Sequence, residues 1–360
     1  MDSRELVYRA LRFEKPDRVP RDLWAVPGVE MFRLDELNQV ADLYPTDITV
    51  PTSVTQKVVT AQSYFGEESS SNSIVFKYGK SERLNGTAFV VGTNIDEWGC
   101  EWQVGEDGVA GEVKRPLLDE WNKLDTFTAP WELINDADWS MVDRFCEKTD
   151  KFVITPWHVN PFERMQFLRG TENLYVDIAL GRKEVFKLRD MVHEFFIKEI
   201  ECWCKTKVDG IRFSDDWGMQ TRLLINPKIW RELFKPIYSE YCRMAHDAGK
   251  FVFYHSDGNI SAIISDLIEI GVDAMNLQLF CMDIEDLGKK YKGKVTIWGE
   301  IDRQHILPYG TPEEVANAVR RVRRALDTGS GGVIAQLEWG KLDPIENIMA
   351  AYKAWLEKLD

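Results

Sequence analysis

The chain has 360 residues, of which 44% are hydrophobic and 29% are charged, a balance typical of a globular protein with a sizeable buried core. The net charge of -14 and the pI near 5 argue against nucleic acid and against a membrane surface as partners, because both attract basic proteins. The N-terminus is charged, without the apolar core of a signal peptide, and no segment reaches transmembrane length, so we expect a cytoplasmic protein.

The first third of the chain contains two candidate strands and a predicted insertion. The strands are RVPRDLWAV and DITVP. The polar passage FGEESSSNSIVFKYGKSERLNGT then leads into AFVVGTNIDEWGCEWQV, which alternates and turns like a β-hairpin. Because no linker or repeat divides the chain, we expect a single domain over residues 1–360, with a β-hairpin insertion at about 65–125.

From residue 150 onward, short apolar strands alternate with amphipathic helices. The strands are FVITPWHV, GIRFSDDWG, FVFYHSDG, DAMNLQ, VTIWGEID and GGVIAQLEWG, and the helices cover 161–206, 227–248, 260–270, 283–290, 312–327 and 344–358. Alternating units of this kind imply a parallel sheet. With the earlier strands they predict an α/β fold, a (β/α)8 TIM barrel with an N-terminal helical extension. A doubly wound open sheet is the alternative, but no G-x-G-x-x-G follows the first strand.

Several helix starts are marked by capping residues. In TPEE, Thr311 is expected at the N-cap, with Pro312 at the first helical position and Glu314 completing a capping box. Asn226 and Pro227 repeat this arrangement in NPKIW.

Polar residues occupy the predicted carboxyl ends of the strands, where the chemistry of such barrels takes place. In chain order they are Trp24, His158, Asp215, Asp216, His255, Asp257, Gln278, Glu300, Asp302 and Glu338. For Asp216 and Asp302 we favour a helix cap or a loop hydrogen bond. For the others, the recurrence of ionisable groups in five of the last six units favours a shared site.

His255 and Asp257 should project from the same face of their strand, because side chains on a strand repeat with period two. Together with Glu338 and Glu300 they form a set of nitrogen and oxygen ligands that could hold zinc with one open position. The metal-free alternative is a carboxylic acid whose pKa is raised by burial and which donates a proton. Both alternatives remain open at this point.

The C-terminal half resembles the uroporphyrinogen decarboxylase superfamily, whose fold is a (β/α)8 barrel. The resemblance rests on FSDDWGMQTRLLINPKIW, FVFYHSDGNI, IEIGVDAMNLQ, IWGEIDRQHILPYGTPEEV and DPIENIMAAYKAW. True uroporphyrinogen decarboxylases carry an arginine-rich segment near the N-terminus, of the form R-Q-A-G-R. This chain has PRDLWAVPGVEMFRL there, with only Arg21 close by, which argues against a porphyrinogen substrate.

The other branch of the superfamily contains corrinoid-dependent methyltransferases. Its thiol-methylating members bind zinc through a His-x-Cys motif and a further Cys, whereas this chain has Asp257 in place of the first Cys and no Cys in QLEWG. The resemblance therefore implies methyl transfer from a small methylated donor, with an aromatic methyl ether (O-demethylation) as the best candidate. The acceptor would be a corrinoid on a separate protein, since no cobalamin-binding D-x-H-x-x-G occurs here.

This reaction suggests roles for the strand-end residues. The leaving oxygen needs an acid such as Asp215 or Glu300, or a zinc ion held by His255, Asp257 and Glu338. Candidates for contact with the donor are Trp24, Trp157, His158, Trp217, Gln278 and Trp339. The alternatives are a decarboxylase of a small carboxylated substrate, with Asp215 or Asp257 as proton donor, and a non-catalytic binding protein. The number of chains per assembly stays open, a homodimer included.

Overall fold

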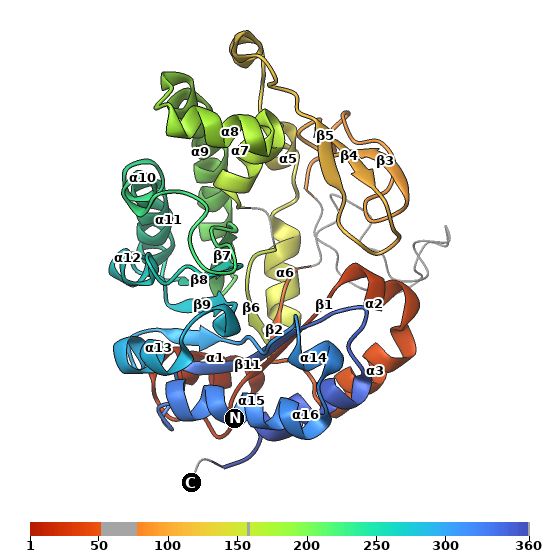
Figure 1. Ribbon diagram of the computed structural model, residues 1–360, viewed down its shortest axis with the longest axis vertical. Helices are drawn as coiled ribbons and strands as arrows, with labels where there is room; N and C mark the ends of the chain where they lie inside the picture. Colours follow the sequence, from red (N-terminus) through yellow and green to blue (C-terminus); the bar gives the residue numbers. More distant parts are fainter. Residues whose placement is uncertain (52–77, 157–158, 359–360) are drawn as a thin grey trace.

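The computed structural model describes residues 1–51, 78–156 and 159–358 (Figure 1). Its strands are β1 (Arg21–Ala25), β2 (Ile48–Thr49), β3 (Gly92–Ile95), β4 (Glu101–Val104), β5 (Glu112–Arg115), β6 (Phe152–Val153), β7 (Gly210–Ser214), β8 (Phe251–Ser256), β9 (Ala274–Leu277), β10 (Thr296–Trp298) and β11 (Val333–Trp339). Its α-helices are α1 (Ser3–Arg12), α2 (Pro27–Phe32), α3 (Leu34–Leu43), α5 (Glu132–Asn135), α6 (Ser140–Lys148), α7 (Pro161–Arg169), α8 (Thr171–Ala179), α9 (Lys183–Cys204), α10 (Pro227–Leu233), α11 (Lys235–Asp247), α12 (Ile264–Glu269), α13 (Ile284–Tyr291), α14 (Ile306–Tyr309), α15 (Pro312–Leu326) and α16 (Ile345–Trp355).

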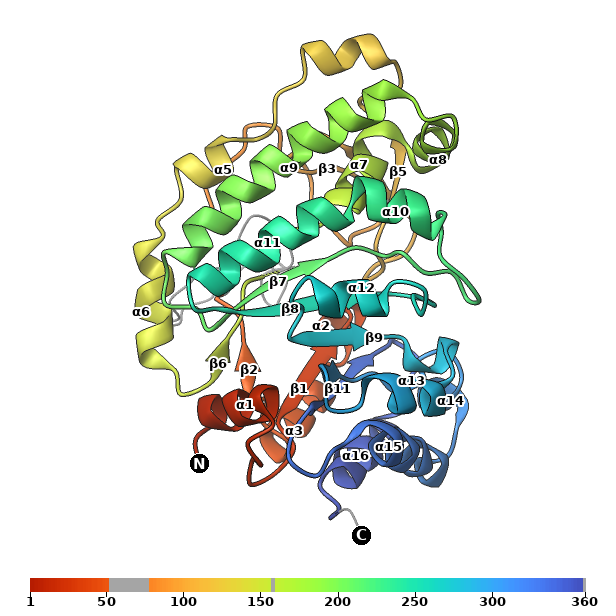
Figure 2. The ribbon, with the colours of Figure 1, turned by 90° about the vertical axis from the view of Figure 1, so that its left-hand side faces the viewer.

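A curled parallel sheet forms the centre of the protein. Six strands pair in the order β1-β11-β10-β9-β8-β7, and β2 pairs with β6 in a parallel ladder of its own. Figure 2 shows helices on the outside of this sheet, with α9 and α11 alongside β7 and β8. Every residue of β7, β9 and β10 is buried, as expected for parallel strands that are covered on both faces. The predicted α/β fold with a parallel sheet is thus confirmed.

The predicted helix starts are confirmed as well. Thr311 Oγ1 accepts a hydrogen bond from the Glu314 amide, and the Glu314 carboxylate accepts one from the Thr311 amide. Asn226 caps α10, with Pro227 at its first position. No helix in the described part of the chain is both long and apolar enough to cross a membrane.

The predicted insertion contains more than a hairpin. Within the described residues it forms a three-stranded antiparallel sheet in the order β3-β4-β5. The part of the predicted range before residue 78 lies outside the described residues. Figure 1 shows this small sheet next to α5 and α7, at the upper right of the view.

Helix α1 is the predicted N-terminal extension, and it closes one end of the curled sheet. Its Val7 and Leu11 pack with Phe152, Phe253 and other side chains that fill the inside of the sheet. Two of its polar residues, Arg4 and Tyr8, contact one buried carboxylate, that of Asp209, just before β7. Asp209 accepts hydrogen bonds from the Val153 amide at 2.7 Å, from Tyr8 Oη at 2.8 Å and from Arg4 Nε at 3.2 Å.

We expect Asp209→Ala to lower the free energy of unfolding by about 2–4 kcal/mol, because it leaves three donors, one of them charged, without their acceptor. Chemical denaturation of the variant and the wild type measures the difference. Asp17→Ala is a matched control, since Asp17 is 70% exposed and its change should stay within about 0.5 kcal/mol. Equal stability of the two variants would contradict this account of α1.

Candidate active site at the carboxyl ends of the strands

Three side chains with metal-binding atoms meet at the carboxyl ends of β7 and β8. Ser214 pairs with His255 in the parallel ladder, and this register places Asp216 beside Asp257. His255 Nε2 lies 3.6 Å from Asp216 Oδ1 and 3.6 Å from Asp257 Oδ1. One ligand atom from each of the three residues lies within 4.8 Å of the others. We call these three residues the His255 group.

The orientation of the His255 ring is set by Asn276 on β9. His255 Nδ1 lies 2.7 Å from Asn276 Oδ1, and Asn276 Nδ2 donates to the Trp298 carbonyl oxygen and, at 2.8 Å, to Gln336 Oε1. Because Oδ1 of an amide can only accept, the hydrogen of the imidazole lies on Nδ1. Nε2 faces the two carboxylates, and in the neutral ring it carries the lone pair, the arrangement found for histidines that bind metals.

The two carboxylate oxygens of Asp257 have different surroundings. Oδ2 pairs with Arg303, whereas Oδ1 is buried and has no hydrogen-bond partner among the described residues. The distance of 3.6 Å from Oδ1 to His255 Nε2 is too long for a hydrogen bond. A buried carboxylate oxygen without a donor is costly unless a cation lies beside it, so the His255 group fits a metal ion that binds nitrogen and oxygen.

Arg303 connects the His255 group to two further carboxylates. Its Nη1 lies 2.6 Å from Glu338 Oε1 and 3.7 Å from Glu300 Oε1. Glu300 is 2% exposed, and its Oε1 has no hydrogen-bond partner in the described structure. Burial raises the pKa of Glu300 well above its usual range, and the nearby charges of Asp257 and Glu338 add to the effect, although Arg303 opposes it. Burial therefore favours the protonated form of the Glu300 carboxyl group.

The structure brings together most of the predicted residues. His255, Asp257, Glu300 and Glu338 belong to one connected cluster, in which Glu338 contacts Arg303. The Trp24 ring packs edge-on against the His255 ring, with centroids 5.5 Å apart. On the next strand, Gln278 Oε1 accepts a hydrogen bond from the Gly258 amide at 2.8 Å.

Three of the predicted site residues, Asp215, Trp217 and Trp339, contact other parts of the protein. Asp215 is fully buried and accepts hydrogen bonds from the Phe162 and Glu163 amides at the start of α7 and from Tyr238 Oη. Burial raises the pKa of Asp215 to about 8.

Trp217 and Trp339 have no exposed surface. The first stacks on Phe162 with centroids 3.8 Å apart, and the second donates from Nε1 to the Asp343 carbonyl oxygen. These two tryptophans are packing residues in this structure. Trp157 and His158 lie outside the described residues.

Sequence reasoning missed three members of the cluster: Asp216, Asn276 and Arg303. Asp216 was expected to cap a helix or bond within a loop, and its place beside Asp257 follows from the register between β7 and β8. Arg303 could have been expected, because several carboxylates at one buried edge require a nearby cation.

Comparisons with known proteins agree with this architecture. Residues 94–355 match the family described as uroporphyrinogen decarboxylase (URO-D). A methyltransferase from Methanosarcina mazei has a similar structure, with a TM-score of 0.67 and 16% identity over 99% of this chain and 98% of that chain. A B12-independent methionine synthase from Shewanella sp. W3-18-1 is more distant, with a TM-score of 0.46 and 12% identity over 91% of this chain and 86% of that chain. Among curated protein sequences no relative was found.

Proposed function

The chain belongs to the uroporphyrinogen decarboxylase family, and we propose that it transfers a methyl group from a small methylated donor to the cobalt of a corrinoid held by a separate protein. The observation that carries this proposal is the His255 group, in which Asp257 Oδ1 is buried and accepts no hydrogen bond among the described residues. The fold shared with the Methanosarcina mazei methyltransferase supports it. So does the sequence PRDLWAVPGVEMFRL, which lacks the arginine-rich segment of true uroporphyrinogen decarboxylases.

We further infer that the eight parallel strands close into a (β/α)8 barrel within one domain over residues 1–360. Two contacts at the ends of the six-stranded sheet support closure. Ile154, just after β6, bridges Gly210 on β7, and the Asp47 amide, just before β2, donates to the Arg21 carbonyl oxygen at 2.8 Å. A closed barrel would put all the strand-end residues around one mouth.

His255, Asp216 and Asp257 would hold a zinc ion. When bound, such an ion supplies Lewis acidity toward the oxygen that leaves from the donor methyl group. Glu338, which we expected among the ligands, is within hydrogen-bond distance of Arg303, so we assign it to holding that guanidinium in place. Arg303 in turn holds Asp257 Oδ2, and Asp257 Oδ1 remains directed toward the metal position.

Asn276→Ala should lower the affinity for zinc about 10- to 100-fold, because it removes the acceptor that fixes the His255 ring. Competition with a chromogenic zinc chelator measures the affinity. Gln278→Ala is the matched control at the carboxyl end of the same strand, since Gln278 contacts Gly258 and Cys281 and not the His255 ring. An unchanged affinity in Asn276→Ala, or an equal loss in both variants, would contradict the assigned role.

Glu300 is the residue best suited to protonate the leaving oxygen, because burial raises its pKa and so favours the protonated side chain. Asp215 is less suited, since its oxygens already accept hydrogen bonds from α7 and Tyr238. Glu300→Gln keeps the size of the side chain but removes the acid, and we expect it to slow methyl transfer by about 100-fold or more.

The pH dependence gives a second readout. At pH values where the zinc ligands are deprotonated, the wild-type rate should be constant while Glu300 keeps its proton and should fall as the pH rises through the raised pKa of Glu300. This fall should be absent from Glu300→Gln. Single-turnover rates across the pH range test this, with Glu232→Gln, an exposed position on α10, as the control. If the rate falls with pH in the same way in both variants, the titration belongs to a group other than Glu300.

The function itself is tested by mixing the zinc-loaded protein with reduced corrinoid protein and a panel of aryl methyl ethers, methylated amines and methanol. Formation of the methyl-cobalt absorption spectrum with an ether supports the proposal and identifies the donor. Failure with every donor overturns it. Release of carbon dioxide from a small aromatic acid without any corrinoid would instead identify the protein as a decarboxylase.

A further inference from the structure

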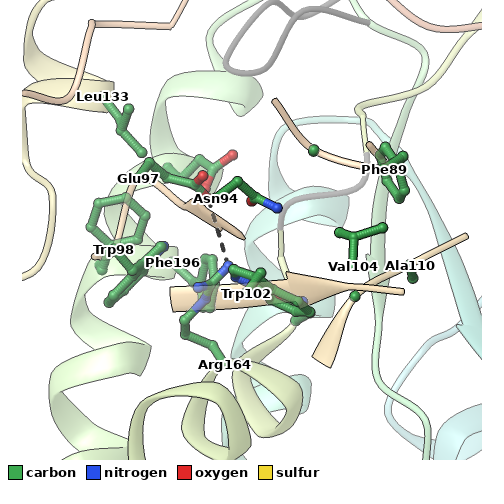
Figure 3. Close-up of a pocket in the computed structure, with 15 residues that line it drawn as sticks. Phe89, Asn94, Glu97, Trp98, Trp102, Val104, Ala110, Leu133, Arg164 and Phe196 are labelled. Atoms are coloured by element: carbon green, nitrogen blue, oxygen red, sulfur yellow. Dashed lines mark ion pairs between the residues drawn. The ribbon is translucent and has the colours of Figure 1, made fainter. Parts of the chain in front are cut away.

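A cavity of about 310 Å³ lies between the antiparallel sheet, α7 and α9 (Figure 3). None of the residues that line it belongs to the His255 group. Five aromatic side chains contribute to the lining, those of Phe89, Trp98, Trp102, Phe195 and Phe196. The volume suits a small organic molecule, and aromatic rings can contact either an apolar group or a cation.

The carboxylate of Glu97, in the lining of the cavity, lacks a close partner. Glu97 is 8% exposed, and its ion pair within the described structure is with Arg164 Nη2 at 3.6 Å, a distance too long for a hydrogen bond. Burial raises the pKa of Glu97, and although the charge of Arg164 opposes this rise, the charge of Asp96 adds to it. A buried carboxylate is costly unless a cation lies beside it, so Glu97 indicates a ligand with a positive charge.

The charges of the other lining residues agree with a cationic ligand. Arg164 is the basic residue of the lining, and it is already paired, because its Nη1 lies 2.8 Å from Asp96 Oδ2. Its guanidinium also lies 5.0 Å from the centre of the Trp98 ring. Two acidic residues, Glu97 and Glu199, share the lining with this one paired cation. An anionic ligand would therefore lose its water without gaining a free positive charge.

Asn94 supplies a second polar group to the same cavity. It is 5% exposed, lines the cavity and lies three residues before Glu97, and Figure 3 labels both side chains in the lining. The Oδ1 atom of an asparagine accepts hydrogen bonds, as a carboxylate does. A primary ammonium group has three N–H donors, so it can bond to Glu97 and Asn94 together while its apolar part contacts the aromatic rings.

A metal ion fits the cavity less well than an organic cation does. Among the described residues, the cluster of three metal-binding side chains is the His255 group, and Glu97 lies outside it. Metal ions in proteins take several such ligands at short distances. An ammonium ion needs only one or two acceptors when aromatic rings surround the rest of the ligand.

We propose that this cavity binds a small organic cation, a primary amine in its ammonium form with one apolar ring, with Glu97 as the counter-ion and Asn94 as a second acceptor. The cavity is lined by other residues than the His255 group, so this binding requires neither zinc nor the corrinoid protein. The inference is independent of the proposed function.

Isothermal titration calorimetry of the full chain with benzylamine, which is a cation at pH 7, tests the inference. We expect one binding site per chain. Benzyl alcohol has the same ring and nearly the same size but no charge, and it should bind at least about tenfold more weakly. Glu97→Gln should weaken the binding of benzylamine by about tenfold, which brings its affinity close to that of benzyl alcohol. Asn94→Ala should weaken the binding of benzylamine by about fivefold, through loss of the acceptor.

Matched variants locate the site. Glu112→Gln removes a carboxylate of β5 that is 74% exposed and outside the lining, and it should bind benzylamine like the wild type. Ala110→Phe should occupy part of the cavity and weaken binding by about tenfold or more. Val109→Phe changes the neighbouring residue, which is 44% exposed and outside the lining, and should leave binding unchanged. Circular dichroism melting shows whether each variant folds.

Equal affinity for benzylamine and benzyl alcohol would overturn the cationic class of the ligand. Equal binding of benzylamine by the wild type, Glu97→Gln and Ala110→Phe would mean that the amine binds elsewhere, and the site would be rejected. An absence of benzylamine binding by the wild type would reject it as well.

Discussion

His255→Ala is expected to abolish zinc binding at the proposed site and to slow the proposed methyl transfer by about three orders of magnitude, equivalent to about 4 kcal/mol of transition-state stabilisation. His255 would supply the nitrogen ligand of the proposed metal site, and its Nε2 lies 3.6 Å from each of the two carboxylates. Without the imidazole, only the oxygens of Asp216 and Asp257 remain, and zinc at neutral pH binds such a pair weakly. The expected loss is larger than that from Asn276→Ala, which changes only the orientation of the ring.

Metal content per chain, measured on protein purified without chelators or metal affinity resin, is the primary readout. We expect about one zinc ion per chain in the wild type and none in His255→Ala. His246→Ala is the matched control, because His246 lies on α11, is 41% exposed and pairs with Asp273 outside the His255 group. Wild-type protein without metal, but fully active, would refute the metal site and leave Glu300 as the acid to test.

Arg303→Met is expected to lower the free energy of unfolding at neutral pH by about 2–4 kcal/mol. Arg303 is 19% exposed and lies within ion-pair distance of all three carboxylates, those of Asp257, Glu300 and Glu338. Its removal leaves carboxylates that repel one another in a largely buried place. Methionine keeps most of the apolar volume, so the loss reports mainly on the missing charge.

The stability lost in Arg303→Met should increase as the pH rises. Arg303 opposes the rise in the pKa of Glu300, so its removal raises that pKa further above the unfolded value. A group with a raised folded-state pKa stabilises the fold below its unfolded pKa, and that contribution is lost as the pH rises through the folded-state value. The variant should therefore be closest to the wild type near pH 5 and furthest from it in the alkaline range.

Urea denaturation at several pH values provides the measurement. Arg321→Met is the control, because Arg321 forms an ion pair with Glu285 on the surface, where it is 43% exposed, and its loss should cost no more than about 1 kcal/mol. Arg303→Lys keeps the charge and should recover part of the stability. If the two methionine variants lose the same amount at every pH, Arg303 does not stabilise the cluster.

Several features of the fold follow from local sequence patterns. Alternating apolar strands and amphipathic helices predict a parallel sheet, because such strands are buried on both faces. Capping at Thr311 and Asn226 depends on neighbouring residues alone, so it could be read without knowing the fold. The third strand of the insertion was missed, since EVKR in β5 is polar and mostly exposed and lacks the apolar alternation of a buried strand.

For the site, the sequence by itself determined that His255 and Asp257 share one face of a strand and that both stand at its carboxyl end. Only the tertiary structure decided which groups surround them. The register between β7 and β8 brings Asp216 to His255, and the loop after β10 turns Arg303 back onto Asp257 and Glu338. Trp217 follows the end of β7, but its side chain stacks on Phe162 of α7. Strand register, the path of a loop and the direction of a side chain are set by packing between segments that are distant in the sequence. They therefore cannot be predicted from the spacing of residues along the chain.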